Sequence, residues 1–190
     1  MKKNFVLAVA VALCAMAISA SAQKAPADFT GKWNLDLTKS KLTDREKTSI
    51  ESMTYTVTQS ATDIKVEIAT KRAAPPAGAP AGGPPGGGGG GGMGGGGGGA
   101  PAPQTFVLGK ETTVDQQMGQ NTVPVKMGSK WDGSKLILST SRTFRGPNGE
   151  VTSTTKETWE LGADGKTLTV NREAVSPRGT DATTRVFTKG

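Results

Sequence analysis

Apolar and polar side chains alternate with a period of two along most of this chain, and this pattern restricts its fold more than any other feature. The clearest stretches have an apolar residue at every second position: Trp33, Leu35, Leu37; Met53, Tyr55, Val57; and Ile64, Val66, Ile68. Spacings of three and four, which an amphipathic helix needs, are almost absent. Because successive side chains of a β-strand point to opposite faces, the pattern predicts an all-β protein whose strands bury one face.

Short turn sequences divide the chain into hairpins. Asp-Gly or Asn-Gly pairs at positions 132–133, 148–149 and 164–165 mark the turns of the C-terminal half. Strands are predicted around these turns and before them, at 33–37, 53–57, 64–68, 106–108, 123–127, 135–145, 151–161, 167–176 and 182–189. Only residues 40–49, with Asp44 as N-cap, are predicted to form a short helix. About 8–10 consecutive strands predict an antiparallel up-and-down barrel or a strongly bent meander, whose closure removes exposed strand edges.

Residues 73–104 interrupt this pattern. They comprise 16 Gly, 7 Pro, 7 Ala, Met93 and Gln104, without one charged residue. Such a composition buries too little apolar surface to offset the entropy of ordering, so we expect a disordered Gly/Pro-rich loop. The glycine runs lack the Lys-Ser/Thr ending of a phosphate-binding loop. Since the ends of a flexible loop meet at small entropic cost, residues 23–190 are predicted to form a single domain around it.

The first 22 residues have the order of a secretory signal peptide. Lys2 and Lys3 precede an apolar run over 5–18, and the small residues of 20–22 follow it. This run is shorter than the ~20 residues that span a bilayer. We therefore expect cleavage after Ala22 and a periplasmic or secreted mature protein with no stable membrane insertion.

The composition excludes several kinds of catalytic site. Without histidine, there is no Ser-His-Asp or Cys-His nucleophile and no carboxylate-His-zinc site. The single cysteine, Cys14, leaves with the signal peptide, and removal of Lys2 and Lys3 lowers the formal charge from +7 to +5. The remaining charges are scattered, unlike the basic stripe of a nucleic-acid site. We expect a monomer with no catalytic residue, no metal, no cofactor and no nucleic-acid partner.

Four polar residues share the apolar phase of their strands and are the candidate ligand-binding residues. Arg142, Glu157 and Arg172 lie on three consecutive predicted strands, and Tyr55 lies on the opposite side. Inside a barrel, such guanidinium groups match the carboxylate of an apolar ligand. The alternative is an ion network that satisfies itself, or charges near strand ends in water.

Two functions fit these features. One is a carrier that binds a small apolar or carboxylate-bearing ligand in the barrel; the other is a non-catalytic cell-envelope structural or interaction protein. The barrel interior distinguishes them. A cavity of several hundred cubic ångströms indicates a carrier, whereas a scaffold has a filled core, here of Met53, Met127, Phe144, Trp159 and Leu168.

Several segments resemble those of lipocalins. Residues 28–35, Asp-Phe-Thr-Gly-Lys-Trp-Asn-Leu, are similar to the Gly-x-Trp opening of that family. Together with residues 36–41, 159–161 and 164–170, they resemble small exported bacterial lipocalin-like proteins of the calycin type. The resemblance implies a barrel in which Trp33 plugs one end and Arg185, on the last strand, packs over its ring in a cation–π contact.

Overall fold

The computed structural model describes residues 26–73, 102–118, 121–146 and 149–190. The predicted signal peptide and residues 74–101 of the predicted disordered insert lie outside the described residues. Both ends of the insert are ordered, because the Ala73 N–H donates to the Ser49 carbonyl at 3.0 Å and Gln104 begins a strand. The strand that begins at Gln104 therefore includes one residue of the segment for which disorder was predicted.

Ten strands and one helix form the described part of the chain. In chain order they are β1 (Gly31–Leu35), α1 (Asp44–Ser49), β2 (Ile50–Gln59), β3 (Asp63–Arg72), β4 (Gln104–Val107), β5 (Glu111–Met118), β6 (Asn121–Asp132), β7 (Lys135–Gly146), β8 (Gly149–Leu161), β9 (Thr167–Ser176) and β10 (Gly179–Lys189). Neighbouring strands are antiparallel, in the order β4-β3-β2-β1-β10-β9-β8-β7-β6-β5. The structure confirms the predicted all-β, up-and-down fold.

The sheet closes almost completely into a barrel. Strand β1 pairs with β10, which joins the two ends of the meander. The open seam of the barrel lies between the two edge strands, β4 and β5. There, β4 approaches β5 and β6 without a ladder, and Ser129 of β6 bridges the gap. Its hydroxyl donates to the Val107 carbonyl at 2.8 Å and accepts from the Gly109 N–H at 3.1 Å. One side chain thus replaces part of the missing ladder.

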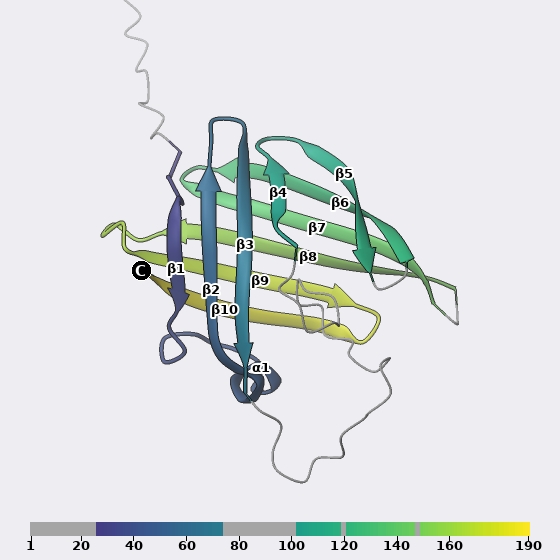
Figure 1. Cartoon of the computed structure of the whole chain (residues 1–190), viewed down its shortest axis with the longest axis horizontal. Coiled ribbons are helices and arrows are strands. Elements are labelled where there is room, and N and C mark those ends of the chain that lie inside the picture. Colours follow the sequence, from purple (N-terminus) through teal and green to yellow (C-terminus); the bar gives the residue numbers. More distant parts are fainter. Residues whose placement is uncertain (1–25, 74–101, 119–120, 147–148) are drawn as a thin grey trace, which may run out of the picture.

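The two halves of the sheet face each other across an aromatic core. Figure 1 shows β1–β4 crossing steeply over β6–β10, so that one sheet folds back on itself. Between the halves, Trp159 meets Phe29 edge to face at 5.7 Å and Tyr55 at 5.8 Å, measured between ring centroids. Tyr55 also contacts Phe187 at 4.5 Å. Burial of such large rings supplies much of the driving force for folding.

Four of the five residues that a filled, scaffold-type core would contain are buried. They are Met53, Met127, Trp159 and Leu168, whereas Phe144 is 40% exposed. Phe144 lies near the tip of the β7–β8 hairpin, which extends beyond the crossing strands (Figure 1). Its strand phase is inward, but the opposite half of the sheet does not reach it.

Strand β5 was not predicted because its sequence, Glu-Thr-Thr-Val-Asp-Gln-Gln-Met, contains little alternation. It pairs only with β6 and forms an edge of the sheet, where Val114 remains 37% exposed. At an edge, backbone pairing with one neighbour specifies the strand, and a continuous apolar face is not required.

Helix α1 lies within the predicted range 40–49, but its N-cap is one residue earlier than predicted. Thr43, not Asp44, is the N-cap: its hydroxyl accepts from the Glu46 N–H at 3.2 Å. The Glu46 carboxylate accepts in return from the Thr43 N–H at 3.2 Å, which completes a capping box. Among the described residues, no helix is long and apolar enough to cross a membrane.

Candidate functional site

A group of polar side chains lies inside the barrel, which we call the inner cluster. It consists of Glu46 of α1, Tyr55 of β2, Glu157 of β8, Arg172 of β9, and Thr183 and Arg185 of β10. Within it, Tyr55, Glu157, Arg172, Thr183 and Arg185 are all at least nine-tenths buried. The structure therefore brings together three of the four predicted ligand-binding residues.

Arg185 connects the barrel interior to the helix. Its Nη2 donates to the Glu46 Oε1 at 2.6 Å, and its Nη1 donates to the Tyr55 hydroxyl at 3.1 Å. The same Glu46 caps α1 through its other carboxylate oxygen. One carboxylate thus holds both the helix end and the buried guanidinium.

Glu157 and Arg172 form the second half of the inner cluster. They stand directly opposite each other on β8 and β9, with Arg172 Nε 3.7 Å from Glu157 Oε1. The other Glu157 oxygen accepts from the Trp159 indole N–H at 2.9 Å. Good charge-assisted hydrogen bonds are shorter, about 2.7–2.9 Å, so this ion pair is loose.

Burial and neighbouring charges shift the pKa values of the cluster. Burial, with a contribution from Glu157, raises the pKa of Tyr55 to about 12. For Glu46, burial opposes ionisation, but the Arg185 charge and hydrogen bonds outweigh it and lower the pKa. Burial and the nearby Arg185 lower the pKa of Arg172. At neutral pH, Tyr55 is therefore a neutral hydrogen-bonding group and Glu46 an ionised one.

Four side-chain atoms of the inner cluster are buried without a hydrogen-bond partner among the described residues. They are Glu157 Oε1, Arg172 Nη2, Thr183 Oγ1 and Arg185 Nε. Thr183 lies opposite Arg172 in the β9–β10 register, and Arg185 lies two residues farther along β10. Buried polar atoms are nearly always hydrogen-bonded, so this concentration distinguishes the inner cluster from the rest of the described core.

Arg142 does not join the cluster. Leu138 is the β7 residue opposite Glu157, and Arg142 lies four residues farther along the strand, ~13 Å away at about 3.4 Å per residue. It is half-buried, and burial lowers the pKa of its guanidinium. The sequence placed it on the correct face of its strand but could not place it along the barrel axis.

The cation above Trp33 is Lys189, not Arg185. The Lys189 ammonium lies 5.2 Å from the centre of the Trp33 ring, and the two residues are directly opposite in the β1–β10 register. Arg185 is four residues away on β10 and bonds to Tyr55 and Glu46 instead. Gly31 has a positive φ of 143°, and a Cβ there would lie 2.8 Å from the Lys189 Cε. The glycine of the Gly-x-Trp motif therefore makes room for this lysine.

Sequence reasoning missed Glu46 and Thr183 and assigned Arg185 to the wrong partner. For Thr183 and Arg185, the inward phase of 183, 185 and 187 was a usable signal. Glu46 gave none beyond its position in a capping box, because its contact with Arg185 spans 139 residues of chain.

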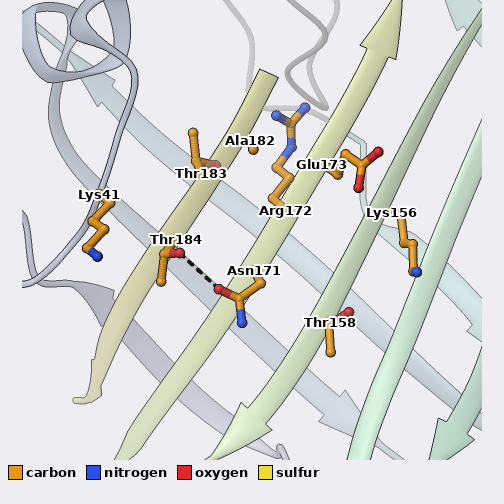
Figure 2. A pocket seen from close by; sticks show the side chains of 9 residues that line it. All are labelled: Lys41, Lys156, Thr158, Asn171, Arg172, Glu173, Ala182, Thr183 and Thr184. Carbon is orange, nitrogen blue, oxygen red and sulfur yellow. Dashed lines mark hydrogen bonds between the residues drawn. The ribbon is translucent and has the colours of Figure 1, made fainter. Parts of the chain in front are cut away.

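Two grooves lie on the outer face of the sheet, over strands β6–β10. The first has a volume of about 320 Å³ and runs over β8, β9 and β10, where Lys41, Lys156 and Glu173 line it. Figure 2 shows its polar side chains, with Asn171 accepting a hydrogen bond from Thr184 at 2.9 Å. The second has a volume of about 470 Å³, lies over β6, β7 and β8, and shares Lys156 with the first.

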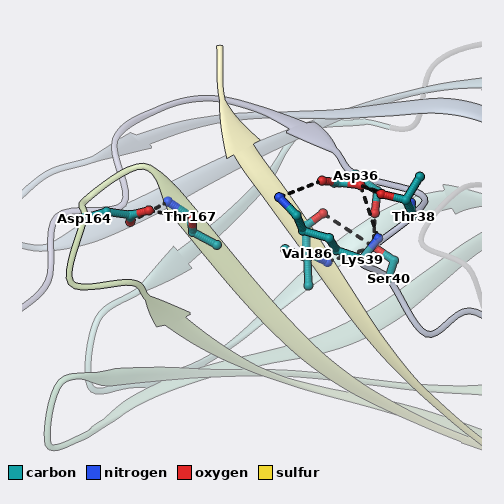
Figure 3. A network of polar contacts seen from close by, with 7 residues as sticks. All are labelled: Asp36, Thr38, Lys39, Ser40, Asp164, Thr167 and Val186. Carbon is teal, nitrogen blue, oxygen red and sulfur yellow. Dashed lines mark hydrogen bonds and ion pairs between the residues drawn. The ribbon is translucent and has the colours of Figure 1, made fainter.

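A turn after β1 holds Lys41 at the first groove. Asp36 accepts from the Thr38 hydroxyl at 2.6 Å, and this bond, with others to residues 38 and 39, lowers its pKa to about 2 (Figure 3). The Ser40 hydroxyl accepts from the Val186 N–H at 2.9 Å. The Lys41 N–H then donates to the Thr184 carbonyl at 2.7 Å. The turn is thereby tied to β10.

The described acidic side chains form no group of three or more that could hold a metal ion.

No protein-family model matches the chain, and no curated protein sequence matches it significantly. Its structure is similar to a REP1-NXSQ fatty acid transporter, with a TM-score of 0.46, 14% identity, and coverage of 85% of this chain and 95% of that one. It is also similar to a zebrafish ileal bile acid-binding protein complexed with cholic acid, with a TM-score of 0.45, 15% identity, and coverage of 85% and 98%. These values assign neither a family nor a ligand to this chain.

Proposed function

We propose that this chain is an exported, non-catalytic β-barrel protein that binds a small, carboxylate-bearing apolar ligand inside the barrel. The observation that supports the proposal most directly is the set of buried, unpartnered atoms in the inner cluster. Arg172 Nη2 and Arg185 Nε are donors, and the Thr183 hydroxyl can act as one. A carboxylate has the acceptor oxygens that these donors lack.

An apolar surface beside Arg142 suits the remainder of such a ligand. Val114, Val125 and Arg142 are directly opposite one another on β5, β6 and β7, so they share the inner face. Val114 and Phe144 on this face are 37% and 40% exposed. This apolar patch lies on the same face as the inner cluster, ~13 Å along the barrel from it. Exposed apolar patches on an inner face are typical of sites that bind amphipathic small molecules.

Calorimetric titration with dodecanoate and with dodecanol tests the proposal. We expect dodecanoate to bind at least about tenfold more tightly, since a hydrogen bond to a charged group contributes roughly 1.5–3 kcal/mol. Thr183→Val should weaken dodecanoate binding severalfold. In the unliganded protein, the same substitution should not reduce stability, because the Thr183 hydroxyl has no partner to lose.

Thr184→Val is the matched control. Thr184 is the next residue, faces outward and donates to Asn171, so its replacement should leave dodecanoate binding unchanged. Equal binding of acid and alcohol, or an unchanged affinity of Thr183→Val, would exclude the inner cluster as a carboxylate site. Native mass spectrometry of protein purified from its own host would then identify the natural ligand.

Export is a separate part of the proposal and has its own test. The order of Lys2, Lys3, the apolar run and the small residues before Gln23 supports it. Intact-mass measurement of protein from the cell envelope or medium should show a chain beginning at Gln23. Retention of residues 1–22 would contradict export by signal cleavage.

A second candidate function is a structural or interaction role in the cell envelope. The filled aromatic core around Trp33, Tyr55 and Trp159 supports it, because these side chains occupy the middle of the barrel. This candidate predicts that no amphipathic probe binds. It also predicts that ordered water alone satisfies the unpartnered atoms of the inner cluster.

A further inference from the structure

The larger outer groove is built around a glycine in the middle of a strand. Gly128 of β6 lies opposite Glu111 of β5 and Ser139 of β7, and leaves the outer face of the sheet open at that point. A Cβ at Gly128 would lie 2.8 Å from the Ser139 hydroxyl oxygen. A glycine inside a strand often marks a place where a ligand approaches the backbone closely.

Unpaired lysines surround this groove. Lys110, Lys126, Lys130 and Lys156 line it, against one carboxylate, Glu111. None of these four lysines forms an ion pair with another residue in the described part of the chain. Elsewhere in the described chain, lysines 39, 47, 65, 71 and 135 each pair with a carboxylate, whereas lysines 32, 166 and 189 do not. The groove therefore concentrates positive charge that no described protein group neutralises.

Hydroxyl groups, and not aromatic rings, occupy the space between the lysines. Ser139, Ser141 and Thr154 line the groove, and none of the described residues lining either outer groove is aromatic. Sites for single-stranded nucleic acid stack bases on aromatic side chains, which are missing here. Hydroxyls and ammonium groups together suit a partner that carries both hydroxyl groups and negative charges.

The basic surface is longer than a small anion. The two outer grooves meet at Lys156, and the first continues across β9 and β10 to Lys41. From β6 to β10 this path crosses four strand spacings, ~19 Å at about 4.8 Å each. We call this surface the outer tract: Lys41, Lys110, Lys126, Lys130 and Lys156 with the groove at Gly128.

We propose that the outer tract binds a segment of an acidic polysaccharide. Lysine ammonium groups pair with successive carboxylates or sulfates of the polymer, and the serine and threonine hydroxyls bond to its sugar hydroxyls. The groove at Gly128 receives one sugar unit against the backbone of β6. The lysine side chains of this site lie on the opposite face of the sheet from the inner cluster, although Arg172 and Thr183 of that cluster also line the first groove.

Fluorescence anisotropy of labelled polygalacturonate at low ionic strength tests the proposal, with neutral dextran and oligothymidylate as comparison polymers. The triple variant Lys126→Ala/Lys130→Ala/Lys156→Ala should bind polygalacturonate at least about tenfold more weakly. For this variant, the slope of log Kd against log salt concentration should decrease by about one for each lysine removed. The matched control Lys47→Ala/Lys65→Ala/Lys71→Ala removes the same charge from α1 and β3 and should change affinity less than about threefold.

A second variant tests the groove without changing charge. Gly128→Val/Ser139→Ala fills the groove and removes the hydroxyl that the new side chain would meet. It should weaken polygalacturonate binding severalfold relative to Ser139→Ala alone, with both variants shown to be folded by thermal melting. Unchanged affinity of the double variant would overturn the proposal that the groove at Gly128 binds a sugar unit. An equal loss of affinity in the two triple variants would overturn the outer tract as a specific site, because net charge alone would then explain binding. Oligothymidylate binding as tight as polygalacturonate would overturn the polysaccharide assignment.

Discussion

Two neighbouring residue pairs on β8 and β9 behave differently because they lie on opposite faces of the sheet. Glu157 stands opposite Arg172 on the inner face, and Lys156 stands opposite Glu173 on the outer face. Backbone pairing places both sets of opposite charges side by side. Within the described residues, however, only the inner pair approaches to ion-pair distance, at 3.7 Å.

Exposed charges on this sheet pair at some positions and not at others: Lys71 and Lys135 each meet a carboxylate, whereas Lys156 and Glu173 stay apart. On the outer face, water solvates each charge, and holding two long side chains together gains at most about 1 kcal/mol. On the inner face, an unpaired charge has no water to replace its partner, so pairing is obligatory although it adds little net stability. The lysines of the outer tract therefore remain solvated, whereas the inner arginines each keep a carboxylate beside them.

Removing the carboxylate charge from each pair should give the largest difference in stability between the inner and outer faces. Glu157→Gln leaves Arg172 buried without a counter-ion and should lower the free energy of unfolding by about 3–5 kcal/mol. Glu173→Gln, on the outer face, should change it by less than about 0.5 kcal/mol. Urea denaturation of both variants measures the two values. Similar small effects would mean that water reaches the inner pair.

In an alkaline titration, the buried Tyr55 should lose its proton about two pH units above the pKa of a solvated tyrosine. The pKa of Tyr55 is raised from 10.0 to about 12, so the unfolded state loses this proton at lower pH than the folded state. Its contribution, on the order of 3 kcal/mol, is complete below pH 10 and is lost as the pH rises toward 12. Tyr55 is the sole tyrosine, so phenolate absorbance reports it directly.

Tyr55→Phe is the control for that titration. It should remove the part of alkaline destabilisation between pH 10 and 12, at the cost of a weaker protein at neutral pH. A phenolate that forms in the native protein near pH 10 would contradict the burial of this hydroxyl.

Acid should act on the junction between the helix and the barrel. Because the pKa of Glu46 is lowered from 4.5, its contribution to stability is present above pH 4.5 and is lost as the pH falls through the lower, folded-state value. Glu46→Gln should cost about 1–2 kcal/mol at neutral pH and flatten the loss of stability below pH 4.5. Denaturation curves at several acidic pH values check both effects.

The smallest expected effect concerns the ring of Trp33. Lys189→Met removes the cation above it and should cost about 0.5–1 kcal/mol. In double-mutant cycles with Trp33→Leu, Lys189→Met should show a coupling energy of this size, whereas Arg185→Met should be additive. Coupling to Arg185 in place of Lys189 would restore the contact that the Gly-x-Trp resemblance implied.

Much of the fold was predictable because it depends on local geometry. Alternation assigned the inward faces of β2, β3 and β7–β10, and the Asp-Gly and Asn-Gly turns located the hairpins. The prediction failed where local pattern carried no information: β5 alternates too little, and Phe144 alternates correctly but lies beyond the covering strands. Both failures occur at the edge or tip of the sheet, where burial depends on distant chain segments.

The sequence by itself determined which side chains of the candidate site point inward, since the period of a strand is set by its own backbone. Only the tertiary structure decided which of them meet. Arg185 contacts Tyr55 and Glu46 across 130 and 139 residues of chain, and Arg142 lies too far along its strand to join them. These contacts depend on strand register and on the steep crossing of the two halves of the sheet (Figure 1), neither of which is encoded in a stretch of neighbouring residues.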